Sequence, residues 1–157
     1  MQSHILSIIL FTPLVGVLVL LFVPTENKNA IRWIANLFSL GGFLISLPLV
    51  PMFWAQRFEP GFKFLEGTPN NWIPSIGAGY NLGIDGISFL LIMLTTLLGW
   101  ISILSSWTAI ENRVKEYYVW FLVLQTGMLG VFMALDFFLF FVFWEAMLVP
   151  MLSLIHI

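Results

Sequence analysis

Residues 136–150 read DFFLFFVFWEAMLVP, an apolar run of Phe, Leu, Val and Trp that a single carboxyl group, that of Glu145, interrupts. Such a run is typical of a segment that lies in lipid. Asp136 stands immediately before it, where a carboxylate can accept hydrogen bonds from the free N–H groups at a helix N-terminus. The stretch therefore predicts a membrane-buried helix that begins after Asp136 and carries one ionisable side chain.

The whole chain has the same apolar character. Its 157 residues are 60% hydrophobic and 9% charged, and the mean hydropathy is +0.99. A soluble domain of this size does not need so much apolar surface, whereas each transmembrane helix takes roughly 20 apolar residues. The composition therefore predicts an all-α, polytopic transmembrane helix bundle.

Five segments fit membrane spans, and the last of them is too short to cross the membrane completely. The second segment contains Pro48 and Pro51, which predict a kink or an early stop near its end. Several aromatic side chains near span ends, Trp100 among them, are expected at the membrane surface. The predicted spans are residues 4–23, 30–54, 86–107, 117–135 and 136–151.

The interval 55–85 is a polar external loop rich in Gly, Pro and Asn. Within it, FKFLE (62–66) and YNLGID (80–85) alternate apolar and polar residues, which is typical of short strands. The pattern fits a small β-hairpin on the membrane surface and fits an irregular loop about equally well.

The distribution of Lys and Arg predicts the orientation. Four of these residues lie in the loops after the first and third spans, and two lie in the loop 55–85. Loops richer in Lys and Arg stay in the cytoplasm, so the N-terminus is predicted on the periplasmic side. The two groups are Lys28, Arg32, Arg113 and Lys115 against Arg57 and Lys63.

Several functional classes have no support in the sequence. The chain lacks cysteine, and His4 and His156 lie at opposite ends, so we expect no metal site and no haem. The net charge of −2 offers no basic face for nucleic acid. No glycine-rich turn follows a strand as in dinucleotide-binding proteins, so we expect no cofactor in this chain.

Glu145 is the exceptional charged residue, because the other thirteen of the fourteen lie in loops or at span ends. Nine residues at 1.5 Å each place it about 13 Å beyond Asp136, near the middle of a bilayer core about 30 Å thick. An ionised group there costs roughly 3 kcal/mol, so it marks either a functional site, such as a proton relay, or a static hydrogen bond between helices. Pro150 cannot donate to the carbonyl of Ala146 and leaves a polar spot nearby. No lysine of this chain is expected to reach Glu145.

Three motifs in order carry a resemblance to a known family: YNLGIDGISF (80–89), MLGVFMALDFFLFFVFWE (128–145) and WEAMLVPM (144–151). Over residues 1–151, the sequence resembles subunit M of bacterial respiratory complex I. That subunit is the antiporter-like, proton-pumping membrane chain of NADH:quinone oxidoreductase, and a complete one has about fourteen spans.

The resemblance implies a proton-path role for Glu145, paired with a lysine two helices further along a complete subunit. It implies other complex I membrane subunits as partners, including adjacent antiporter-like subunits, and a place in the bacterial inner membrane. The redox groups of the complex (NADH, FMN, iron–sulfur clusters and quinone) then belong to other subunits. Asp85 and Asp136 match recurrent positions, and helix capping is their expected role. The alternatives are a subunit of a related sodium/proton antiporter or membrane-bound hydrogenase complex, and a small membrane anchor protein.

The last six residues, LSLIHI (152–157), depart from the family pattern. The DNA string CTGTCTCTTATACACATC, the end of a transposon-based sequencing adapter, translates to the same six residues. We therefore expect residues 152–157 to be adapter read-through and residues 1–151 to be the N-terminal part of an antiporter-like subunit.

Overall fold

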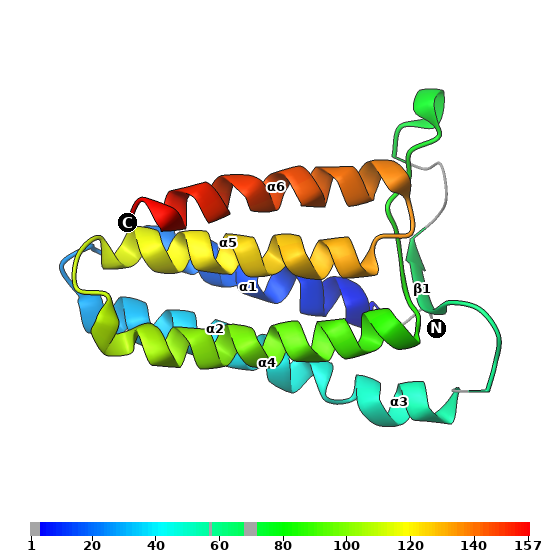
Figure 1. Ribbon diagram of the computed structural model, residues 1–157, viewed down its shortest axis with the longest axis horizontal. Coiled ribbons are helices and arrows are strands. Elements are labelled where there is room, and N and C mark those ends of the chain that lie inside the picture. The colour runs from blue at the N-terminus through cyan, green and yellow to red at the C-terminus, as the bar shows by residue number, and fades with distance from the viewer. Residues whose placement is uncertain (1–3, 57, 68–71) are drawn as a thin grey trace.

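A computed structural model describes residues 4–56, 58–67 and 72–157, and its long helices run side by side in one bundle (Figure 1). Two short strands and a 3-10 turn, Pro74–Ile76, lie at one end, which we call the sheet end. The helices of the described residues are α1 (Ile5–Phe22), α2 (Lys28–Ser46), α3 (Leu49–Ala55), α4 (Gly86–Ala109), α5 (Val114–Met133) and α6 (Phe137–Ile155).

In the described part of the chain, four helical segments are long and apolar enough to cross a membrane, namely Ile5–Phe22, Lys28–Ala55, Gly86–Ala109 and Phe137–Ile155. This confirms the predicted helical membrane bundle. The predicted span 117–135 corresponds to α5, which is not among the four. Because α5 contacts α1, α2, α4 and α6, those helices shield it from lipid, and it tolerates buried polar side chains such as Gln125.

The kink expected in the second span lies between α2 and α3. Leu47 still donates its N–H to the carbonyl of Phe43, and the chain then turns at Pro48. Pro51 falls in the first turn of α3, where a missing N–H costs little because that group would be free in any case. The two prolines therefore divide one span into two helices.

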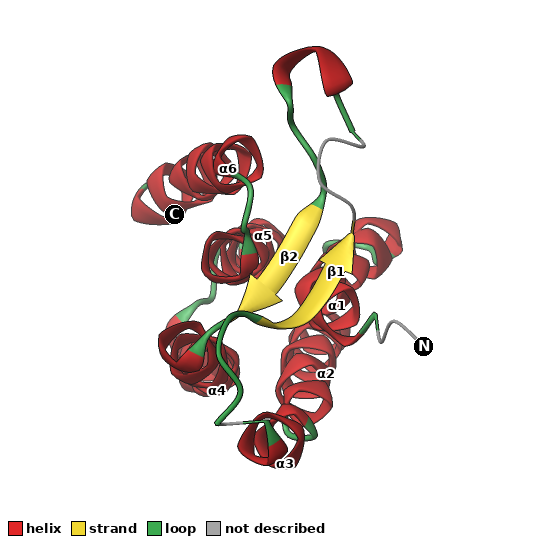
Figure 2. Cartoon of the chain, turned by 90° about the vertical axis from the view of Figure 1, so that its right-hand side faces the viewer, coloured by secondary structure: helices red, strands yellow, loops and turns green. Residues whose placement is uncertain are grey.

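The two strands, β1 (Lys63–Gly67) and β2 (Asn81–Ile84), pair antiparallel and lie across the helix ends (Figure 2). The β alternative for the external loop is thus confirmed over these strands, while residues 68–71 and Arg57 lie outside the described residues. The sheet also joins the turn between α5 and α6, because Leu135 N–H donates to the carbonyl of Asn81 at 2.9 Å.

The two aspartates expected to cap helices do so. The Asp85 carboxylate accepts from the N–H of Ser88 at 2.7 Å, and this hydrogen bond lowers the pKa of Asp85. The Asp136 carboxylate accepts from Phe138 and Leu139 at the start of α6, at 2.9 and 3.2 Å. Both carboxylates also favour the positive end of the helix dipole, so they stabilise the first turns of α4 and α6.

A third carboxylate, that of Glu66 on β1, caps α1 from a distance of sixty residues in the sequence. It accepts from the N–H groups of Leu6 and Ser7 at 2.6 and 2.9 Å, and from the Ser7 hydroxyl at 2.6 Å. Glu66 is 1% exposed, and the hydroxyl groups of Ser7 and Tyr80 lie 2.8 Å apart. Burial, and to a smaller extent the charge of Glu66, raises the pKa of Tyr80.

Basic side chains bind the carboxyl ends of α1 and α4 at the opposite end of the bundle. Lys115 donates to the carbonyls of Leu21 and Val23 at 2.9 and 2.8 Å. Lys28 and Arg32 donate to the carbonyls of Glu111 and Ile110, at 2.8 and 2.9 Å. Cations therefore lie at helix C-termini and carboxylates at helix N-termini, as the helix dipole favours.

We expect Glu66→Gln to lower the free energy of unfolding by about 2 kcal/mol. Glutamine has one acceptor oxygen in place of two and no charge, and its NH₂ group would face the N–H groups of α1. Unfolding with sodium dodecyl sulfate in detergent micelles measures the difference. Glu59→Gln removes the same charge from an exposed side chain and serves as the control. Equal stability of the two variants would show that Glu66 does not hold α1.

Candidate functional site

One face of α6 packs closely on glycines of α5. A Cβ atom at Gly127 would lie 2.9 Å from the Cβ of Met147 and 3.3 Å from its Cα. A Cβ atom at Gly130 would overlap the ring of Phe143. These glycines are three residues apart and share one face of α5, so they set both the separation and the rotation of α6.

Glu145 lies on the opposite face of α6. In the sequence it is two residues from both Phe143 and Met147, and two residues correspond to a rotation of about 200° around the helix axis. Its side chain is accordingly exposed, as are those of Phe141 and Val149 along the same face. In α6 only Leu139 and Pro150 are buried. Most of the surface of this helix is therefore available for contact with lipid or with other protein.

No described residue forms a hydrogen bond or an ion pair with Glu145. All three lysines of the chain donate to backbone carbonyls away from Glu145. Lys28 and Lys115 donate to carbonyls at the C-terminal ends of α4 and α1, respectively. Lys63 donates to the carbonyl of Glu59. Any cation that pairs with it must come from outside the described residues.

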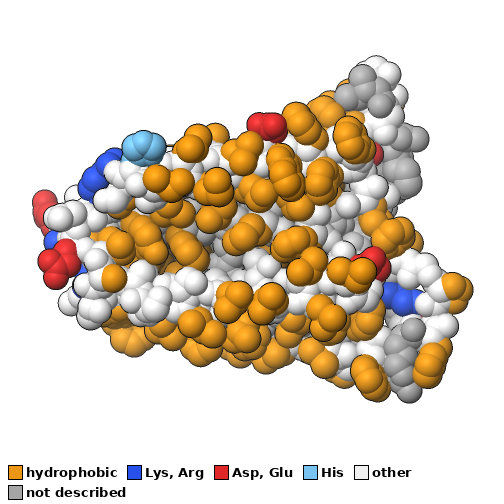
Figure 3. Space-filling model, viewed as in Figure 1, with side chains coloured by type: hydrophobic (Ala, Val, Ile, Leu, Met, Phe, Trp, Pro, Cys, Tyr) orange, Lys and Arg blue, Asp and Glu red, His pale blue; other side chains and the backbone are white. Residues whose placement is uncertain are grey.

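The surface around Glu145 is apolar. Figure 3 shows hydrophobic side chains over the middle of the bundle, with charged groups gathered mainly towards its ends. Pro150, which is buried, lies five residues beyond Glu145 within α6 and cannot donate to the carbonyl of Ala146. Glu145 is therefore an ionisable side chain on an otherwise apolar outer face of α6.

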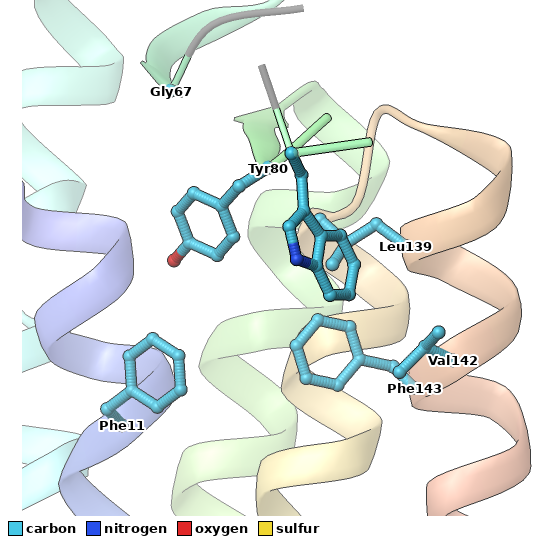
Figure 4. Close-up of a pocket in the computed structure, with 7 residues that line it drawn as sticks. Phe11, Gly67, Tyr80, Leu139, Val142 and Phe143 are labelled. Atoms are coloured by element: carbon cyan, nitrogen blue, oxygen red, sulfur yellow. The ribbon is translucent and has the colours of Figure 1, made fainter. Parts of the chain in front are cut away.

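A separate apolar pocket of about 500 Å³ lies between α1 and α6 near the sheet end (Figure 4). Phe11 comes from α1, Val142 and Phe143 come from α6, and Trp72 and Tyr80 come from the external loop. Glu145 is not part of its lining, and none of the described lining residues carries a carboxylate or an amine. These residues therefore offer no proton acceptor of the kind that Glu145 provides.

Comparisons with known proteins agree with this architecture. No protein-family model matches the chain. NADH-quinone oxidoreductase subunit M of Rhodobacter capsulatus is 45% identical over 99% of the chain and 30% of its own length. NADH-ubiquinone oxidoreductase chain 4 of Chondrus crispus is 39% identical over 93% of the chain and 29% of its own length. Subunit M of Rickettsia conorii is 33% identical over 100% of the chain and 32% of its own length.

A solved structure, that of the membrane-bound sulfane sulfur reductase, an archaeal respiratory membrane complex, is similar with a TM-score of 0.73. It is 25% identical in sequence, over 93% of this chain and 22% of the matched chain. This chain spans about 30% of the length of the curated relatives. With identities of 33–45% over nearly all of its residues, the chain belongs to the family of NADH-quinone oxidoreductase subunit M and NADH-ubiquinone oxidoreductase chain 4.

Proposed function

We propose that this chain is part of a proton-translocating membrane subunit of an NADH–quinone oxidoreductase, with Glu145 as a carboxyl group of the proton path. The observation that carries the proposal is the position of Glu145. It lies in the middle of a span-length helix, faces away from the helix on which that helix packs, and has no partner among the described residues.

A carboxyl group in this position can exchange a proton with a facing amine. The neutral carboxyl gives its proton to a neutral lysine, which leaves a carboxylate and an ammonium group that attract each other. The reverse transfer restores two neutral groups. When the carboxyl group and the amine are far apart, the low-dielectric interior favours these neutral forms. The resemblance in sequence assigns the lysine to a helix beyond residue 157.

The proposal includes the surroundings of the chain. Its partners are the other membrane subunits of the complex, among them antiporter-like subunits, whereas further helices of the same subunit cover the exposed face of α6. The membrane is the bacterial inner membrane, with the sheet end on the periplasmic side, because Lys28, Arg32, Arg113 and Lys115 gather at the other end of the bundle. Electron transfer from NADH to quinone through FMN and iron–sulfur clusters takes place in other subunits.

A second candidate is a subunit of a related sodium/proton antiporter or membrane-bound hydrogenase complex. The similarity to a sulfane sulfur reductase complex supports this alternative, because a chain of similar fold occurs in that different respiratory complex. Both candidates assign an ion path to Glu145. They differ in the coupled ion, so dependence of transport on sodium would favour the second.

We expect Glu145→Gln in the complete subunit to reduce proton pumping by roughly tenfold or more, because an amide cannot exchange the proton. Pumping is measured in proteoliposomes with a pH-sensitive dye during NADH oxidation, and assembly is checked by native electrophoresis. The control is Glu116→Gln, since Glu116 forms an exposed ion pair with Arg113 at the end of the bundle. Wild-type pumping by an assembled Glu145→Gln complex would contradict the proposal and favour a structural or anchoring role for this chain.

We also expect Gly130→Ala to impair pumping, because the added methyl group pushes α6 away from α5 and changes the direction of Glu145. Gly41→Ala is the matched control, since its Cβ would meet only a methyl group of Thr12 at 3.9 Å. Pumping per assembled complex is compared for the two variants. If both pump alike, the glycine face of α5 does not position Glu145.

A further inference from the structure

Three helices bring buried polar groups together on the side of α5 away from α6. The hydroxyl of Ser39 on α2 donates to Oε1 of Gln125 on α5 at 3.2 Å. The indole N–H of Trp100 on α4 donates to Oδ1 of Asn36 on α2 at 3.4 Å. Each amide oxygen thus has a donor, and each bond joins two helices.

These two hydrogen bonds belong to one cluster. Asn36 and Ser39 are three residues apart and therefore neighbours on one face of α2. On α4, Gly99 precedes Trp100, and a Cβ atom at Gly99 would lie 2.6 Å from Nε2 of Gln125. The absence of a side chain at Gly99 lets the Gln125 amide approach α4 beside the Asn36–Trp100 pair.

The amide nitrogens of this cluster lack acceptors. Gln125 is 0% exposed and Asn36 is 7% exposed, and no described residue accepts from Nε2 of Gln125 or Nδ2 of Asn36. Turning the Asn36 amide around would place its NH₂ group against the N–H of Trp100. Turning the Gln125 amide would exchange an unpaired NH₂ group for an unpaired carbonyl. Neither rearrangement satisfies the cluster.

The chemistry of the cluster identifies its ligand. Unpaired N–H groups require an acceptor, which excludes a metal cation, and Asn36, Ser39, Trp100 and Gln125 carry no positive charge that would hold an anion. A small neutral molecule that accepts from an amide N–H and donates in return fits, and buried water commonly binds such groups with two to four hydrogen bonds.

We propose that the amides of Asn36 and Gln125, with Ser39, form a binding site for ordered water between α2, α4 and α5, inside the membrane-spanning part of the bundle. The site is separate from Glu145, which lies on the outer face of α6 and forms no hydrogen bond with any described residue. Its occupancy therefore does not depend on the proton path proposed for Glu145.

X-ray radiolysis tests the site in the complete complex, because a bound water becomes a hydroxyl radical that oxidises the nearest sensitive side chain. Trp100, which bonds to Asn36, is the reporter. We expect mass spectrometry to show oxidation of Trp100 several-fold faster in the wild type than in Gln125→Met. Thr126→Val is the control, because it removes a neighbouring buried hydroxyl whose one hydrogen bond among the described residues goes to the carbonyl of Leu122, so Trp100 should be oxidised at the wild-type rate. Equal rates in the wild type and Gln125→Met would overturn the proposal.

A density map of the wild-type complex decides the question if Gln125→Met does not assemble. Water density within hydrogen-bonding distance of Gln125 Nε2 and Asn36 Nδ2 supports the site. A map that shows buried waters elsewhere but none here, or a protein side chain that fills the position, refutes it.

Discussion

The carboxylate of Glu66 holds the first turn of α1, and the arrangement of the sheet end depends on this contact. Through Glu66, β1 is joined to α1. Its partner β2 leads directly into Asp85 and α4, and the carbonyl of Asn81 holds the turn that precedes α6. Three helix N-termini are thus connected by one small sheet, and each carries a carboxylate that stabilises its free N–H groups.

This connection bears on the candidate site because it restricts α6 at its beginning. Asp136 caps α6 and also accepts from the N–H of Gly79 in the external loop at 3.3 Å. Further along, Gly127 and Gly130 hold the same helix against α5. With its start and one face fixed, α6 cannot rotate freely, so Glu145 is kept on the outer face. The α5–α6 packing therefore connects the fold to the proposed chemistry.

Whether a feature of this molecule can be predicted from the sequence depends on how many residues separate the interacting partners along the chain. Hydropathy predicts the spans, and the capping roles of Asp85 and Asp136 follow from bonds to residues two or three positions away. Glu66 could not be assigned in this way, because its partner is sixty residues distant and only the paired strands bring them together. Trp100, expected at the membrane surface, donates instead to Asn36 between helices. For Glu145, spacing predicted its depth, but only the packing of α6 shows the direction of its side chain.

In the proposed function, the outer face of α6 presents Glu145 to a cation supplied by the rest of a proton-pumping subunit. The most direct test is a structure of the assembled complex, from which the distance between the Glu145 carboxylate and the nearest Lys or Arg nitrogen is measured. We expect a lysine from another helix within about 6 Å, at which distance opposite charges couple strongly. A Glu145 side chain that faces lipid, or that faces only uncharged groups within about 10 Å, would contradict it.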